Sequence, residues 1–414
     1  MRSDAEKIYR GAIDACLPDA AVKEALSSFT LPDGRLFLVA IGKAAWKMAS
    51  AAVDIITNEM RGRIDRGIVI TKYAHSEGEI PGVEIYEAAH PVPDKSGIEA
   101  TERVLEMTRG LGAGDAVLFL ISGGGSALFE SPYCSLDELK SLTKSLLACG
   151  ADINEINAVR KHISKVKGGR FAEHVYPAKI YAVVLSDVLG DKPDTIASGP
   201  AAPDTTSSED VKAILKKYNI PVSKNTEKVL EFETPKSVKN AEHFISGSVT
   251  GLCAAAKNLA ESLGYKSEIV TSCECGEARS LGERMANLAI EKSDTDVPLA
   301  YIFGGETVVK LRGNGLGGRN QETVLSASIK IAGRKNIAIF SVGSDGTDGP
   351  TDAAGGYADG ESYDKMIMTG IDPVSYLENN DSYHALSKCG GLIFTGPTGT
   401  NVNDVAVVLI RAIT

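Results

Sequence analysis

The chain has 414 residues, of which 43% are hydrophobic and 24% are charged, and its formal net charge is -10. These proportions are ordinary for globular proteins and exclude a fibrous or disordered chain. The acidic balance, without a basic block, excludes a nucleic-acid-binding protein, because phosphodiester backbones are bound by clustered Lys and Arg. A chain of this length predicts two domains.

The cysteines and the N-terminal segment indicate a cytoplasmic protein. Seven scattered cysteines do not form a disulfide framework. The close pair Cys273 and Cys275 lacks the second ligand pair that a zinc site needs, so all seven are interpreted as structural. Residues 1–16 are acidic and unlike a signal peptide, and no apolar run is long enough to span a bilayer. We therefore expect no membrane partner.

The first half alternates short β-rich apolar runs with longer helical stretches, which is the pattern of βαβ units. From these patterns we predict a Rossmann-like doubly wound parallel sheet in a three-layer α/β/α domain. Strands are predicted over residues 36–41, 67–71, 83–87, 117–121 and 180–185, and helices near 44–59, 96–109, 135–149 and 152–165.

A polar stretch breaks this rhythm, and we place a domain boundary near residue 236. The predicted domains are residues 1–236 and 237–414. The two runs on either side of Gly304-Gly305-Glu306 are close enough to form a hairpin, so the second, smaller α/β domain should have a mixed sheet. Its predicted strands cover residues 268–271, 300–303, 307–311, 337–342, 392–395 and 405–410.

A glycine triplet follows the apolar run 116–121. It reads Ser122-Gly123-Gly124-Gly125-Ser126. Without Cβ atoms, backbone N–H groups can turn toward an anion, and a following helix start would add its positive dipole end. The alternative is a tight turn that needs glycine only for its backbone angles. One or two glycines would suffice for such a turn, so the triplet favours a phosphate-binding site.

Lys43 follows the first predicted strand, within Gly42-Lys43-Ala44. A lysine at a helix start could hold a phosphate or a carboxylate, although a solvated lysine fits the same position. The pattern Gly-x-x-x-x-Gly-Lys-Ser/Thr does not occur, so the chain contains no P-loop.

Acidic and basic side chains cluster around the strand ending at residue 185. Asp187 and Asp191 follow it, and carboxylates there can hold Mg²⁺ or accept a hydroxyl proton. An Asx turn with a helix cap is the alternative for Asp187. Arg160, Lys161 and Lys167 supply cations, some of which would be a solvated helix face, and the neighbouring His162 is interpreted as structural.

The second half carries a glycine-rich run, residues 313–318, which matches Gly-x-Gly-x-x-Gly after a strand. It raises the alternative of an NAD(P)H-dependent hydroxypyruvate reductase. The next strand-end acid, Asp345, lies further on than the usual spacing of about twenty residues. With Asp348 it opens an acidic loop that suits a hydrated metal or a nucleotide with its Mg²⁺. Residues 395–404 are a further polar strand end, and a series of β-turns fits them equally well.

Together these strings resemble the glycerate 2-kinase family, in the family's order and over essentially the whole chain. Ala127 departs from it, because relatives often have a second serine there. The strings are Gly42-Lys43-Ala44, Ser122-Gly123-Gly124-Gly125-Ser126, Val159-Arg160-Lys161-His162 with Lys167-Gly168-Gly169, Ser186-Asp187-Val188 with Gly190-Asp191, Ile196-Ala197-Ser198-Gly199-Pro200, Gly304-Gly305-Glu306-Thr307, Gly318-Arg319-Asn320-Gln321-Glu322 and residues 343–356.

The resemblance implies a catalytic cleft between the domains and ATP-dependent phosphorylation of D-glycerate with Mg²⁺. It makes Lys43 and Arg319, from opposite domains, the main cations on the transferring phosphoryl group. It favours the 2-hydroxyl as acceptor, and it leaves a homo-oligomer open. A non-catalytic sensor of a nucleotide or sugar acid is the remaining alternative.

Phosphoryl transfer needs positioning and charge neutralisation, which assigns roles to the candidate residues. Lys43 and Arg319 would stabilise the transition state, and Asp187 would be the base or a metal contact. Arg160 or Lys161 would bind the glycerate carboxylate, and Lys167 would bind the substrate or a phosphate. The residues expected at the phosphate are Ser122, Gly123, Gly124, Gly125 and Ser126, and those at the nucleotide or metal are Asp191, Glu306, Asn320, Asp345 and Asp348.

Overall fold

The computed structural model describes residues 1–186 and 193–413. Its internal contacts divide the chain into two compact units, Ala21–Ser246 and a discontinuous unit of Met1–Ala20 with Gly247–Thr414. This division differs from the boundary near residue 236. The run around Phe244 is the last strand of the first sheet, and the first twenty residues belong to the second unit.

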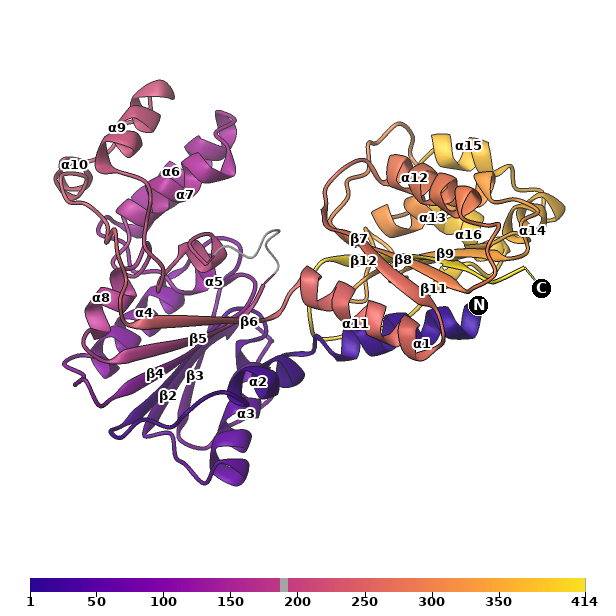
Figure 1. Cartoon of the computed structure of the whole chain (residues 1–414). Coiled ribbons are helices and arrows are strands. Elements are labelled where there is room, and N and C mark those ends of the chain that lie inside the picture. The colour runs from indigo at the N-terminus through magenta and orange to yellow at the C-terminus, as the bar shows by residue number, and fades with distance from the viewer. Residues whose placement is uncertain (187–192, 414) are drawn as a thin grey trace. The chain divides into compact units, whose positions relative to one another are not determined.

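The first unit is built on a six-stranded sheet (Figure 1). The strands lie in the order β3-β2-β1-β4-β5-β6, which is the order typical of a doubly wound dinucleotide-binding domain. β1 pairs in parallel with β2 and β4, β2 with β3, and β4 with β5, as predicted. The strands are β1 (Leu36–Ile41), β2 (Arg66–Lys72), β3 (Val83–Ala88), β4 (Ala116–Ile121), β5 (Lys179–Leu185) and β6 (Ala241–Gly247).

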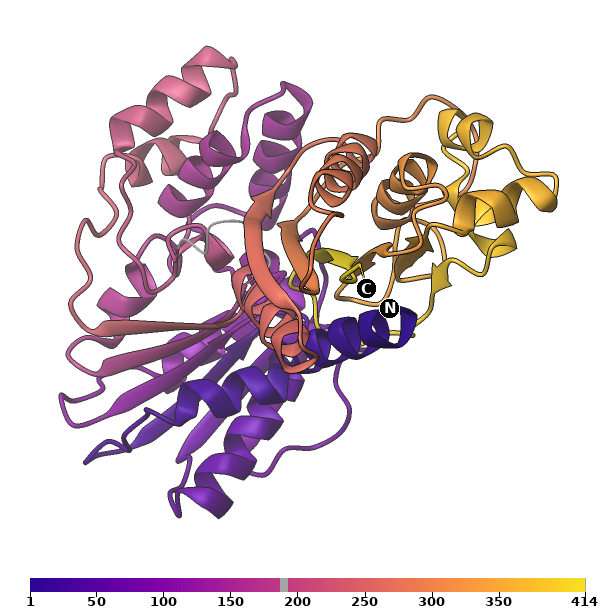
Figure 2. The same ribbon diagram turned by 45° about the vertical axis from the view of Figure 1, so that its right-hand side comes forward.

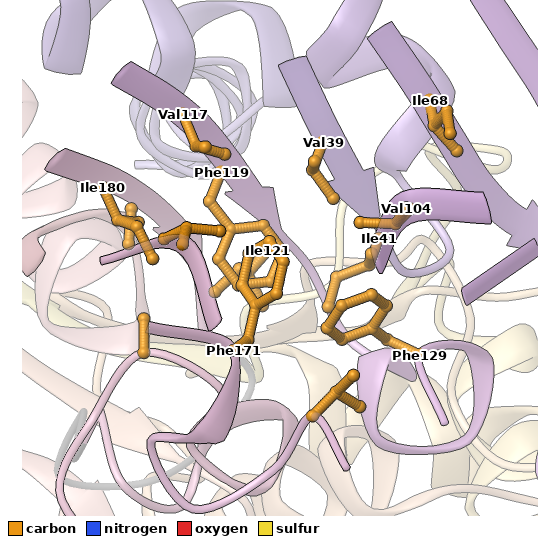
Figure 3. Packing of buried hydrophobic residues seen from close by; sticks show 14 of the residues in the cluster. Val39, Ile41, Ile68, Val104, Val117, Phe119, Ile121, Phe129, Phe171 and Ile180 are labelled. Atoms are coloured by element: carbon orange, nitrogen blue, oxygen red, sulfur yellow. The ribbon is translucent and has the colours of Figure 1, made fainter. Parts of the chain in front are cut away.

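Helices cover both faces of this sheet. α3 (Ala45–Asp54), which continues into η1 (Ile55–Glu59), packs on β1 and β2, while α4 (Lys95–Met107) and α8 (Arg170–Val175) lie on the opposite face. Every residue of β1 is buried because it is covered on both sides. Figure 3 shows the core on the α4 and α8 face, where the rings of Phe119 and Phe171 lie 5.1 Å apart.

A helical cluster beside the sheet has its own small apolar core, which includes Leu142, Val159, Val211 and Leu230. The sequence predicted the first two helices of this cluster but not the last two. Its helices are α6 (Leu136–Ala148), α7 (Ile153–His162), α9 (Ser208–Lys217) and α10 (Lys224–Val229).

The second sheet is mixed, as expected, but not because of a hairpin at residue 305. Residues 307–311 form no strand, and the antiparallel neighbours of β12 are β8 and β9. β7 pairs in parallel with β8. The strand order is β11-β10-β9-β12-β8-β7. The strands are β7 (Lys266–Glu274), β8 (Leu299–Gly305), β9 (Ile337–Gly343), β10 (Gly355–Asp359), β11 (Leu392–Ile393) and β12 (Asp404–Ile410).

The helices of the second unit also lie on both faces of its sheet (Figure 1). α12 (Ala278–Glu291) and α13 (Arg319–Lys330) pack together over one face. Against α13 pack the short helices α14 (Ser362–Met368), α15 (Pro373–Glu378) and α16 (Ser382–Lys388). α11 (Val249–Ser262) lies on the other face.

The first helix, α1 (Arg2–Asp14), lies alongside α11, as Figure 2 shows for the indigo and salmon helices. The hydroxyl of Tyr265 donates to Asp4 at 2.8 Å, and the ring of Tyr9 meets that of Phe340 at 6.0 Å. Beyond α1, α2 (Pro18–Leu26) carries the chain toward the first unit. Among the described residues, no helix combines the length and apolarity needed to cross a membrane.

Candidate active site

Two loops at the carboxyl ends of neighbouring strands form the first part of the site. Because β1 and β4 are adjacent and parallel, the chain leaves both strands at the same edge of the sheet. The amide of Lys43 donates to the carbonyl of Gly123 at 2.9 Å, and the amide of Ala44 donates to Oγ of Ser122 at 3.1 Å. Lys43 and the glycine triplet, predicted from separate motifs, are therefore held together.

Close contact between these loops requires Gly42. Its φ is +114°, and a Cβ there would lie 2.3 Å from Oγ of Ser122. The Ser122 side chain is only 3% exposed and donates to the carbonyl of Ile41 at 3.2 Å. The structure thus gives Ser122 a role in joining the loops, in place of the expected phosphate contact.

The glycine triplet offers backbone amides rather than a helix dipole. The helix after it, α5 (Gly125–Leu128), is a single turn of 4 residues, so the expected dipole does not contribute. Gly124 has a φ of +88°, in the left-handed region. Within residues 1–186 and 193–413, the amides of Gly123 and Gly124 donate to no protein acceptor. Two neighbouring N–H groups are therefore open to an anion.

Ser126 contacts a strained short helix, η2 (Ile196–Ser198). Its hydroxyl lies 3.0 Å from that of Ser198. Ala197 and Ser198 have φ values of +51° and +60°, which residues other than glycine seldom adopt. Backbone strain of this kind concentrates at functional sites.

Arg160 brings a buried charge to the triplet from α7. Its Nη2 donates to the carbonyl of Ser126 at 3.1 Å, whereas its buried Nε has no hydrogen-bond partner in the described part of the chain. Burial lowers the pKa of Arg160, and the charge of Glu130 opposes that change only in part. An anionic ligand would compensate the free-energy cost of burying this charge.

Three further basic side chains gather here: Lys72, His75 and His90. A Cβ on Gly124 would lie 3.1 Å from Nε2 of His90 and 3.4 Å from Cγ of Lys43, and Nδ1 of His75 lies 3.1 Å from the carbonyl of Lys43. Sequence reasoning missed these residues. The rule that ligand groups follow strand ends would have found His90, which comes two residues after β3.

Three cations of this group have no ion-pair partner in the described structure. Lys43, Lys72 and Arg160 form no ion pair with any carboxylate of residues 1–186 or 193–413, although the whole chain is acidic. The loops after β1, β2, β3 and β4 therefore form a positive site suited to a carboxylate or a phosphate.

Two of the predicted cations are not part of this open site. Lys167 is fully buried, lies 3.0 Å from Glu130 and donates to the carbonyl of Phe129 at 2.6 Å. Burial lowers the pKa of Lys167 to about 8. Lys161 is also buried and pairs with Asp204 at 3.3 Å. Both lysines are paired with buried carboxylates, and their role in ligand binding stays a prediction.

In the second unit, Arg319 is the first residue of α13, and Asp348 caps that helix. The amides of Asn320 and Gln321 donate to the two oxygens of Asp348 at 3.1 and 2.9 Å. Burial raises the pKa of Asp348 to about 6, with a further contribution from Asp404 and against the effect of these hydrogen bonds. Asp348 therefore positions Arg319. Both of its oxygens already accept backbone hydrogen bonds, and its role at a metal or nucleotide stays a prediction.

The Arg319 guanidinium is held by two acids. Nε and Nη2 donate to Asp404 at 2.5 and 3.0 Å, and Nη1 donates to Glu306 at 2.9 Å. Burial alone would lower the pKa of Arg319, but the bonds to Asp404 and the charge of Glu306 outweigh it and raise the pKa. Asp404 was not among the predicted site residues, although its place at the end of the polar run 395–404 was a usable signal.

The other predicted metal and nucleotide residues are not gathered into a metal cage. Asp345 accepts from the amide of Thr347 at 2.9 Å and is half-buried, while Asn320 is buried and bonds Ser341 and Asp348. Among residues 1–186 and 193–413, no three His, Cys, Asp or Glu side chains converge as metal ligands. Asp187 and Asp191 lie outside the described residues.

The glycine-rich run before α13 is explained by packing. A Cβ would lie 2.3 Å from Asn379 at Gly313, 2.4 Å from Asp381 at Gly315 and 2.1 Å from Ser382 at Gly317. These glycines let the loop lie directly on the α15–α16 connection. The pattern that raised the dehydrogenase alternative is thus accounted for without a dinucleotide.

Two family models match the chain. The domain of unknown function DUF4147 matches residues 4–231, and the MOFRL family matches residues 299–404.

Named relatives match nearly the whole chain. A D-glycerate 2-kinase of Thermotoga maritima is 52% identical over 99% of this chain and 98% of its own. A glycerate 2-kinase of Pyrococcus horikoshii is 41% identical over 92% of this chain and 88% of its own. A relative from Agrobacterium vitis, 39% identical over 98% of this chain and 94% of its own, bears only a provisional name as a hydroxypyruvate reductase.

Two crystal structures are similar to the model. A glycerate kinase of Thermotoga maritima superposes with a TM-score of 0.94, at 52% identity and over 99% of both chains. A Pyrococcus horikoshii protein superposes with a TM-score of 0.93, at 38% identity, over all of this chain and 99% of its own.

Proposed function

Since the chain belongs to the glycerate 2-kinase family, we propose that it transfers the γ-phosphoryl group of ATP to the 2-hydroxyl of D-glycerate. The observation that carries the proposal is the 52% identity with a D-glycerate 2-kinase over 99% of this chain. The chemistry of the site supports it, because unneutralised cations and open amides suit the carboxylate of a hydroxy acid and a transferring phosphoryl group.

The first unit would hold the acceptor and the migrating group. Lys43 would stabilise the charge of the phosphoryl group, with the amides of Gly123 and Gly124 as further donors. Arg160 would bind the glycerate carboxylate, because its guanidinium is buried beside the triplet and carries no ion pair among the described residues.

The second unit would act on the nucleotide through Arg319. Its guanidinium is oriented by Asp404 and by the cap at Asp348, and we propose that it acts on the same phosphoryl group as Lys43 during catalysis. Mg²⁺ would neutralise charge on the ATP phosphates. In proteins, Mg²⁺ is usually held by such phosphates and by one or two carboxylates, not by a cage of protein ligands alone. We propose Asp345 and Glu306 as these carboxylates.

Asp187 remains our proposed base or metal contact, by its place after β5, and Asp191 our proposed nucleotide or metal residue. The hydroxypyruvate reductase alternative has no support from the glycine run at residues 313–318, which is occupied by backbone contacts. It remains to be tested by its own reaction.

The decisive assay supplies ATP, Mg²⁺ and D-glycerate to the purified protein and follows ADP. Coupling to enolase identifies the product, because enolase consumes 2-phosphoglycerate directly. We expect ADP in proportion to D-glycerate and an immediate enolase signal. Formation of the 3-phospho isomer, or no ADP at all, would refute the proposal.

Three controls make the assay specific. A Lys43→Met preparation made in parallel should be nearly inactive, which excludes a contaminating kinase. Hydroxypyruvate with NADH should leave NADH unoxidised. Asp187→Asn should lower kcat by about 10²-fold or more if this residue is the base; a normal kcat would remove it from the mechanism.

A further inference from the structure

We propose that His90 binds the hydroxy acid at the glycine triplet, with ring Nε2 forming a hydrogen bond to a hydroxyl group of the acceptor. This inference rests on the proposed function and assigns a further substrate-binding residue to the same site.

The geometry places a polar ring edge where the acceptor must lie. A Cβ on Gly124 would be 3.0 Å from Cδ2 and 3.1 Å from Nε2 of His90, so the Nε2 edge of the ring faces the triplet. The two open amides of Gly123 and Gly124 are beside it. A ligand that accepts from those amides therefore comes within hydrogen-bonding reach of His90.

Within the described residues, the His90 ring has no partner of its own. Four of the other five histidines have one in the described part of the chain, the exception being His243 on β6: His75, His162 and His174 bond the carbonyls of Lys43, Ala158 and Leu105, and His384 bonds Asp381. His90 is half-buried and forms no hydrogen bond or ion pair with residues 1–186 or 193–413. A structural histidine would normally be satisfied by the protein.

The groups around His90 determine the charge state of its ring. Burial and then the charges of Lys43, Lys72, His75 and Arg160 lower the pKa of His90 below its ordinary value of 6.5. Lys43 and His75 come from the loops after β1 and β2, Lys72 ends β2, and Arg160 lies on α7, while the Asp94 carboxylate accepts from the backbone of Ala89 beside the ring. The ring is therefore neutral at physiological pH, with one N–H and one lone pair.

With a neutral imidazole among cations, the two polar groups of the acceptor molecule bind to different side chains. The carboxylate of a hydroxy acid is bound by Arg160 and its neighbouring cations. The uncharged hydroxyl is bound by the ring, which can donate to it or accept from it. His90 would thus help to select an acid that carries a hydroxyl beside its carboxylate over a simple carboxylic acid.

The kinetic test compares His90→Ala and His90→Gln with His384→Gln, which changes an exposed histidine of the other unit. We expect His90→Ala to raise KM for D-glycerate by at least 10-fold and to leave KM for ATP within about 2-fold. His90→Gln should show a smaller increase, because its amide keeps a neutral hydrogen-bonding group. His384→Gln should match the wild type. Equal KM values for D-glycerate in wild type and His90→Ala would count against the proposal.

A second readout is measured on the wild-type protein. The chain has 6 histidines, so the ring C–H resonances of the wild-type protein can be resolved by NMR, and His90→Gln identifies the His90 signal. We expect that signal to titrate below 6.5 and to move when D-glycerate is added, but not when propionate is added. A His90 signal unmoved at saturating D-glycerate would overturn the inference.

The two proposals fail separately. If the wild type forms ADP from D-glycerate while the His90 signal and KM do not respond, the role of His90 is wrong and the kinase function stands. If no ADP forms, the kinase function is wrong, and the NMR titration with D-glycerate still decides whether His90 binds a hydroxy acid.

Discussion

Both carboxylate oxygens of Asp404 accept hydrogen bonds from the guanidinium of Arg319, at 2.5 Å from Nε and 3.0 Å from Nη2. The pair joins the first residue of β12 to the first residue of α13. Asp404 is only 6% exposed, so the guanidinium plane is fixed by a group that is itself held in the sheet. We infer that Asp404 acts through the orientation of Arg319.

Asp404→Asn should lower kcat by about 10- to 100-fold, because an amide cannot accept two charged hydrogen bonds and the arginine loses its fixed orientation. Glu361→Gln is the control, since the Glu361 carboxylate makes an exposed ion pair with Lys365 and has no place in the proposed site. It should change kcat by less than about 3-fold. Steady-state kinetics with both substrates saturating checks this, and a normal kcat in Asp404→Asn would contradict it.

Lys43→Met should lower kcat by about 10²- to 10³-fold, the usual effect of removing one group that stabilises transition-state charge. Lys47→Met is the control, because Lys47 lies one turn further along, is exposed, and pairs only with Glu77 among the described residues. Its kcat should be unchanged. Isothermal titration calorimetry with ATP checks that the variants still bind nucleotide.

If Lys43 and Arg319 act on one phosphoryl group, their substitutions should not be additive. The double variant Lys43→Met with Arg319→Met should be less impaired than the product of the two single effects. Single-turnover rates measure this coupling. Full additivity would mean that the two cations act in separate steps.

Lys167→Met should destabilise the first unit by about 3 to 5 kcal/mol, because it leaves Glu130 charged and buried without its partner. The double variant Lys167→Met with Glu130→Leu should recover most of this loss. The exposed pair Lys95 and Glu99 is the control, and Lys95→Met should cost less than about 1 kcal/mol. Urea unfolding followed at Trp46 measures all four proteins.

Asp348→Asn should change how stability depends on pH. The folded protein raises the pKa of Asp348 from 3.8 to about 6, so between these values the folded state holds more protons than the unfolded state. Stability of the wild type relative to the variant should therefore fall as pH rises from about 4 to about 6 and stay constant above. The total change should be at most about 3 kcal/mol.

Urea unfolding by circular dichroism between pH 4 and 8 tests this, since Trp46 lies in the other unit. Losing one capping bond lowers the unfolding free energy of the variant by the same amount at every pH, so it does not affect how the difference between the two proteins changes with pH. A relative stability that rises through this range would show that the carboxylate is stabilised, not penalised, by the fold.

Gly315→Ala should cost about 1 to 3 kcal/mol in unfolding free energy, because the new Cβ would lie 2.4 Å from Asp381 and the loop must move. Gly112→Ala, where the nearest atom to the new Cβ is 3.8 Å away, should be close to neutral. Thermal unfolding compares the two. Tight NADH binding by the wild type that is lost in Gly315→Ala would instead revive a dinucleotide role for this loop.

The sequence predicted the first sheet well because its strands are buried on both faces and read as continuous apolar runs, as in residues 36–41. It missed β10 (Gly355–Asp359), which begins with two glycines and carries no β-rich run. The apolar run 307–311 was predicted as a strand, yet it forms only an isolated bridge through Val308. Local pattern cannot decide whether such a run finds a partner strand.

The sequence predicted several residues of the candidate site, but not which side chains they contact. Lys43 and the glycine triplet were found because both follow strands, and the fold joins them through Gly42 and Ser122. That Lys167 is neutralised by Glu130, and that Asp348 caps α13, depends on contacts between residues distant in the chain. Charge alone in a sequence does not separate a ligand-binding lysine from a buried, paired one.

The packing of α1 on α11 has a consequence for how the protein is made. Residues 1–20 are translated before the whole of the intervening unit, and their partners, such as Tyr265 and Thr400, are translated only after it. During synthesis, α1 therefore cannot pack on α11 until the intervening unit has been translated. Deleting residues 1–20 should accordingly destabilise the unit that contains residues 247–414.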